Sequence, residues 1–66
     1  MNANKNHVIN FVETRLHWAK ERPEDVMPYL HQAFGAICFY IDNLDKYDNE
    51  WEEIWETYRH EFEKLL

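Results

Sequence analysis

Apolar residues recur every three or four positions along almost the whole chain, and no stretch alternates apolar and polar residues as a half-buried strand would. This spacing predicts three helices, at about 5–20, 26–44 and 49–65, with boundaries good to about two to four residues. Helices of similar length joined by short connections favour antiparallel neighbours. We therefore expect one all-α domain over 1–66, a small bundle of three antiparallel helices in which 1–4 are frayed.

Two interruptions separate the helical stretches. The first, 21–28, contains Pro23 and Pro28, which cannot both lie in a helix interior because proline lacks a backbone N–H and clashes with the preceding turn. The second, 44–49, is rich in Asp and Asn. Both have the composition of short connections between helices.

The third helix has the narrowest apolar face, since its apolar residues fall within an arc of about 120°. Trp51, Trp55, Tyr58 and Phe62 form a stripe that is most often core, although Trp and Tyr are also enriched at binding hot spots. Asn49 followed by Glu52 has the pattern of a capping box. We expect a surface helix with one buried face.

The second helix is apolar over an arc of about 200°, so two neighbours are needed to cover it and it should be the central element. Gly35 lies in its interior, where glycine costs about 1 kcal/mol relative to alanine. It projects toward the polar side, near Phe39, which lies outside the apolar arc. Close approach of another backbone, from a second copy of the chain, would explain this glycine.

The first helix is apolar over about 180°, and Arg15 falls inside that arc beside Phe11 and Trp18. One interpretation is that the Arg15 stem packs on apolar surface while its head stays in water. The other is an ion pair with a carboxylate of the third helix, Glu61 or Glu56. We favour the first, because exposed ion pairs contribute at most ~1 kcal/mol.

The first two apolar faces are wider than the roughly one third of its surface that each helix can bury in such a bundle. The surplus predicts a partner, and a second copy of the same chain, giving a homodimer, is the simplest one. The predicted interaction surface consists of aromatic residues, the arginine within the apolar arc of the first helix, and the glycine in the interior of the second helix. These residues are Phe11, Arg15, Trp18, Gly35, Phe39, Trp51, Trp55 and Tyr58.

The charge balance argues against nucleic acid as a direct partner. The chain has 66 residues with 13 acids and 7 bases, and the whole net charge of −6 arises in residues 34–66. Binding to phosphates or to anionic membranes requires the opposite sign. An alternative function follows from the same asymmetry: an acidic antagonist that mimics nucleic acid and blocks a basic surface of a partner protein.

Cys38 is the only cysteine, so no internal disulfide can form, and a reducing, cytoplasmic location is expected. The longest apolar run, Ala33 to Ile41, has nine residues, whereas a membrane-spanning helix needs about 20. The segment 1–6 lacks the apolar core of a signal peptide. A chain this short also has little wall for a catalytic cleft of several hundred Å³.

No constellation of catalytic or metal-binding residues stands out. Serine is absent, Cys38 sits in an apolar helix where burial would make it inert, and no second histidine accompanies His60-Glu61 as a zinc-protease helix requires. His17 and His31 fall on polar faces. We expect a non-catalytic, self-associating interaction or regulatory module without cofactor or metal.

Overall fold

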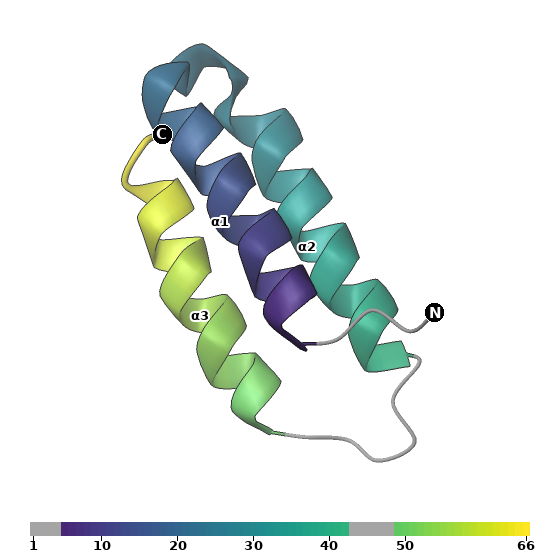
Figure 1. The fold of residues 1–66 in the computed structure, drawn as a ribbon. Coiled ribbons are helices and arrows are strands. Elements are labelled where there is room, and N and C mark those ends of the chain that lie inside the picture. The colour runs from purple at the N-terminus through teal and green to yellow at the C-terminus, as the bar shows by residue number, and fades with distance from the viewer. Residues whose placement is uncertain (1–4, 43–48) are drawn as a thin grey trace.

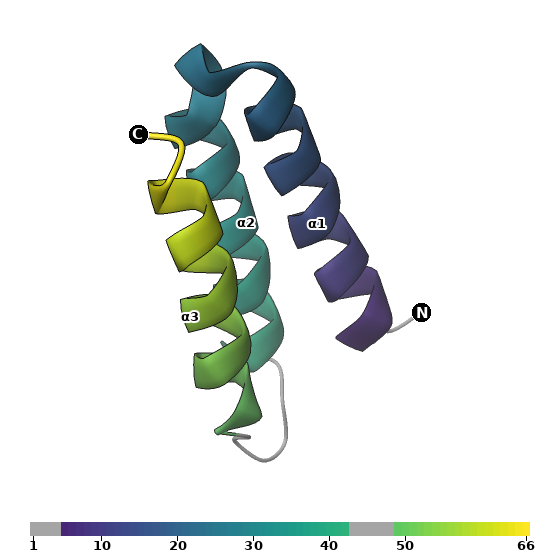
Figure 2. The same ribbon diagram turned by 90° about the vertical axis from the view of Figure 1, so that its left-hand side faces the viewer.

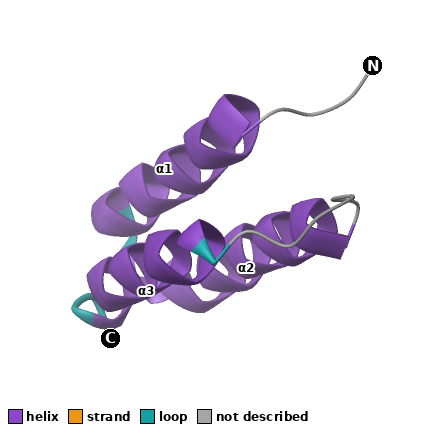
Figure 3. Cartoon of the chain, turned by 90° about the horizontal axis from the view of Figure 1, so that it is seen from below, coloured by secondary structure: helices purple, strands orange, loops and turns teal. Residues whose placement is uncertain are grey.

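The computed structural model of the protein describes residues 5–42 and 49–66. These residues form the helices α1 (Lys5–Glu21), α2 (Val26–Asp42) and α3 (Glu50–Glu63), with a short 3-10 helix, η1 (Pro23–Asp25), between α1 and α2. Each α-helix packs against the other two, so the chain is a small all-α bundle (Figures 1 and 2). The described ranges contain no strand (Figure 3).

The three predicted helices are confirmed, with small differences at their ends. α1 extends one residue further than expected, to Glu21, and α3 ends earlier, at Glu63. Beyond α3 the Lys64 N–H donates to the His60 carbonyl at 3.1 Å, which closes a last turn. The predicted end of the second helix at 43–44 and the frayed segment 1–4 lie outside the described residues.

Asn49 precedes α3, but its side chain makes no capping hydrogen bond. Its backbone is already helical, with φ −60° and ψ −20°, whereas a capping side chain reaches into the first turn from extended backbone. The Glu52 N–H instead donates to the Asn49 carbonyl at 3.0 Å. The predicted capping box is therefore wrong, although acidic residues do occupy the first turn of α3.

The connection between α1 and α2 is short because both prolines are accommodated at helix starts. Pro23 opens η1, and Pro28 lies in the first turn of α2, where backbone N–H groups have no intrahelical acceptor to lose. The Arg22 N–H donates to the Trp18 carbonyl, and the Asp25 N–H to the Arg22 carbonyl, both at 2.9 Å. The break spans fewer residues than the sequence suggested.

The core is built from all three helices. α2 contacts both neighbours, as its broad apolar arc requires, and two tilted ring pairs join it to α3: Phe34 with Trp55 at 5.0 Å and Tyr40 with Trp51 at 4.9 Å between ring centroids. The buried residues are all apolar: Val8, Val12, Leu16, Ala19, Val26, Ala33, Ile37, Trp51 and Phe62.

Candidate interaction surface

The eight residues predicted to form one interaction surface fall into two groups. Trp51 is only 2% exposed, and Trp55 and Tyr58 are half-buried against the core, so these α3 residues pack inside the bundle. The other five belong to α1 and α2; Trp18, Gly35 and Phe39 are exposed, and Phe11 and Arg15 are half-buried. The aromatic stripe of α3 thus contributes mainly to the core.

Arg15 forms the centre of a cluster on the α1–α2 side of the molecule. Its guanidinium carbon lies 3.9 Å from the centroid of the Phe11 ring and 4.5 Å from that of Trp18. Its Nε donates to Oε1 of Gln32 on α2 at 2.9 Å. The Trp18 ring meets Tyr29 edge to face at 5.8 Å. We call these five residues the Arg15 cluster.

Neither carboxylate proposed as a partner for Arg15 reaches it. Glu56 pairs with Arg59, and Glu61 pairs with Lys64 at 3.2 Å. The reason is the orientation of α1: Glu13 bonds to α3, and a residue two positions later points about 200° away around the helix. The ion-pair interpretation is wrong, and the half-buried Arg15 is held by ring faces and an amide.

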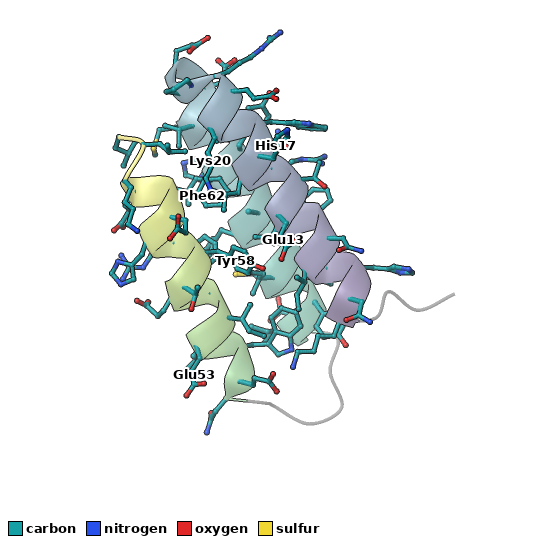
Figure 4. The ribbon with its side chains drawn as sticks, turned by 60° about the vertical axis from the view of Figure 1, so that its left-hand side comes forward. Glu13, His17, Lys20, Glu53, Tyr58 and Phe62 are labelled. Carbon is teal, nitrogen blue, oxygen red and sulfur yellow. The ribbon has the colours of Figure 1, made fainter. Side chains whose placement is uncertain are left out.

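The opposite side of α1 is tied to α3 by polar contacts. The Tyr58 hydroxyl donates to Oε1 of Glu13 at 2.6 Å, and the two side chains point toward one another (Figure 4). Burial, and then this hydrogen bond, raise the pKa of Tyr58 to about 12. Near the start of both helices, Lys5 Nζ lies 2.6 Å from Glu50 Oε1 and 5.8 Å from the centroid of the Trp51 ring.

Gly35 and Phe39 lie on the outward face of α2. Each is two positions from the buried Ile37, and so points away from the core. A Cβ added to Gly35 would meet nothing within 4 Å, and Phe39 is 69% exposed. No backbone of the described chain approaches Gly35, so the close approach expected there does not come from within the molecule.

The carboxylates of α3 are largely matched by bases of the same chain. Arg59 bonds both Glu56 and Glu63, and its hydrogen bond to Glu56 holds the pKa of that carboxyl below its usual value. The same bonds raise the pKa of Arg59. At least four of the six α3 glutamates are in ion pairs: Glu50, Glu56, Glu61 and Glu63.

The titratable side chains of the described ranges form no group of three metal-ligand residues. His17, His31 and His60 are exposed, and His17 Nε2 lies 3.1 Å from Glu21 Oε1. Cys38 is half-buried, not buried as expected, because it follows Ile37 and so lies at the edge of the core-facing arc.

A shallow hollow with a volume of about 340 Å³ opens beside the Arg15 cluster and is lined by Trp18, Glu21, Arg22 and Tyr29. It is an open depression of the surface and not a walled cleft. Its wall carries one carboxylate, from Glu21, and one guanidinium, from Arg22, beside the rings of Trp18 and Tyr29.

Neither the roles of Gln32 and Tyr29 nor the pairing of Glu13 with Tyr58 was predicted from the sequence. Helical spacing predicts the Glu13–Tyr58 contact only once the alignment of α1 against α3 is known.

None of the helices in the described ranges has the length and apolarity to cross a bilayer. The chain matches no protein-family model, and the comparisons with the curated proteins and with the solved structures found no match.

Proposed function

We propose that this chain is a small helical interaction module that self-associates as a homodimer and has no catalytic activity of its own. The observation that supports this is the aromatic surface on the outside of α1 and α2, where Trp18 is 39% and Phe39 69% exposed. Single exposed apolar residues are ordinary, whereas a group of aromatics on one side of a small domain is typical of an interface.

The proposal includes an antiparallel course for consecutive helices. Along α1 the order Arg15, Trp18 matches the reversed order Gln32, Tyr29 along α2. The ring pairs between α2 and α3 are reversed in the same way. In such a bundle α3 covers one side of the α1–α2 pair, which leaves the other side for the second copy.

The acidic-antagonist alternative has less support. A ridge that imitates phosphates needs carboxylates free to attract a basic partner, and most α3 glutamates are paired within the chain. A cytoplasmic location remains part of our proposal, supported by the lone cysteine. Retention of basic proteins from a lysate by the immobilised chain at low salt, with release at high salt, would favour the antagonist instead.

Sedimentation equilibrium over a concentration range from about 1 μM to several hundred μM tests self-association directly, because mass action shifts a dimer equilibrium over such a range. We expect the weight-average mass to rise from the 8.2 kDa of one chain toward twice that value. A mass that stays at that of one chain throughout would overturn the proposal.

A further inference from the structure

The outward face of α2 carries a large exposed ring and an empty position one helical turn apart. Phe39 is 69% exposed, and around Gly35 the space that a Cβ would occupy has no atom within 4 Å. Helices that pack against each other place a side chain of one into a space between side chains of the other. This face therefore offers both the protruding side chain and the space that would receive it.

We propose that α2 pairs with α2 of a second copy in antiparallel orientation, with each Phe39 ring seated over the partner's Gly35. A twofold axis midway between the two residues generates both contacts at once, as a self-complementary dimer interface requires. This inference rests on the proposed self-association and adds to it the helix, the residues and the register.

The same register brings opposite charges together. Gln32 lies three residues before Gly35, and Asp42 three residues after Phe39, so the partner's Asp42 comes level with Gln32 and with the Arg15 guanidinium that bonds it. Gln32 and the partner's Asp42 lie on opposite lateral sides of the contact, so the proposed dimer requires the two α2 helices to cross in the sense that aligns their i, i+3 rows, Gln32–Gly35 and Phe39–Asp42. Within one chain, Gln32 and Asp42 are about 15 Å apart along the helix, beyond the reach of Arg15.

Arg15 is suited to receive that carboxylate. The rings of Phe11 and Trp18 fix the plane of the guanidinium, and Gln32 occupies only Nε. In the described part of the chain neither Arg15 nor the exposed Asp42 has an ion-pair partner. The two terminal nitrogens form the edge that binds a carboxylate in a bidentate manner.

Gly35→Ala separates the interface from the fold. In the monomer the added methyl group meets nothing and favours the helix, so the melting temperature at concentrations where the chains are monomeric should rise by about 4–8 °C. In the dimer the methyl group meets the partner's Phe39, and the dissociation constant should rise on the order of tenfold. A variant that is more stable and yet dimerises less has no explanation in the monomer alone.

Phe39→Ala should weaken dimerisation at least roughly tenfold, because it removes the inserted ring. Leu66→Ala is the matched control. Leu66 follows α3, is 69% exposed like Phe39, and lies outside the proposed interface. Its dissociation constant should stay within about twofold of that of the unaltered chain.

A mixing experiment tests the charge pair. Arg15→Glu alone places like charges opposite Asp42, and Asp42→Lys alone places like charges opposite Arg15, so each variant should be monomeric. When the two variants are mixed, both contacts of the heterodimer join opposite charges, and dimers should reappear in sedimentation. Circular dichroism of each variant verifies that its helices are intact.

The outcomes separate the register from self-association itself. If the unaltered chain never dimerises, both the proposed function and this register fail. If it dimerises but Gly35→Ala and Phe39→Ala leave the dissociation constant unchanged, self-association stands and this register is wrong. If those two variants weaken the dimer but mixing restores nothing, the ring contact stands and the Arg15–Asp42 contact is wrong.

Discussion

The α1–α2 pair has two sides that differ in how deeply their side chains are buried and in which groups they contact. On the side that faces α3, the aromatic rings of Trp51 and Phe62 are buried and Glu13 receives the Tyr58 hydroxyl. On the other side, Phe39 is mostly exposed and Arg15 is held by ring faces and Gln32, without a carboxylate from the described residues. Helix α3 covers most of the first side, where Phe34 beside Trp55 still remains 45% exposed, and Phe39 on the second side is the more exposed ring at 69%.

The difference shows where the chain places its apolar residues. One side closes the core, where each lost contact lowers the free energy of unfolding. The other holds Phe39 largely in contact with water, where a ring contributes little to the stability of one chain. Substitutions on the two sides should therefore affect different properties, namely folding on one side and association on the other.

The largest effect is expected for Phe62→Ala. Phe62 is fully buried, and truncation of a buried phenylalanine lowers the free energy of unfolding by about 3–5 kcal/mol. The whole domain has only about 3–10 kcal/mol to lose, so the variant should lose a large share of its stability, measured by urea denaturation followed by circular dichroism. Phe39→Ala is the matched control on the other side and should change monomer stability by no more than about 0.5 kcal/mol. Equal losses in the free energy of unfolding for both variants would show that the two sides contribute alike to the stability of one chain.

Tyr58→Phe should have an intermediate effect. It removes the hydrogen bond to Glu13 and should lower the free energy of unfolding by about 1–2 kcal/mol at neutral pH, measured by urea denaturation. Tyr29→Phe is the control, because the Tyr29 hydroxyl has no hydrogen bond within the described ranges.

The Tyr58 contribution should depend on pH. Its pKa is raised in the folded chain, from 10.0 to about 12, so the stabilisation is complete below pH 10 and is lost as the pH rises toward 12. The difference between the unaltered chain and Tyr58→Phe should therefore shrink over that interval. A difference that stays constant from pH 9 to about pH 12 would show that the Tyr58 proton does not contribute.

A smaller effect on monomer stability than that of Tyr58→Phe is expected for Arg15→Met, which keeps an unbranched apolar stem but loses the guanidinium stack and the bond to Gln32. We expect a loss of about 0.5–1 kcal/mol in the free energy of unfolding at concentrations where the chain is monomeric. Arg15→Lys keeps the charge but not the planar group, and should lose nearly as much. Full retention of stability by Arg15→Lys would mean that charge alone matters at this position.

The helices were predictable because their apolar positions follow the helical period over many turns, and a pattern of that length determines both the type of element and the face it buries. The capping box at Asn49 was not, because a residue pattern does not contain the backbone angles on which capping depends. The burial of Cys38 was overestimated for a related reason: it lies at the edge of an apolar arc, where a small rotation of the helix decides the exposure.

The candidate surface was predictable only in part. Periodicity placed Arg15 beside Phe11 and Trp18, and the structure has them in contact. The partners on other helices, Gln32 for Arg15 and Tyr58 for Glu13, depend on how α1 is rotated and aligned against its neighbours. That alignment results from packing of the whole core, and no local pattern in the sequence specifies it.

The short connection at residues 22–25 has a kinetic consequence. Because so few residues separate α1 from α2, closing this pair costs little chain entropy, whereas the Glu13–Tyr58 contact must join residues 45 apart. We expect α1 and α2 to assemble first and α3 to dock later. Until α3 docks, both sides of the pair are open to water and to other chains.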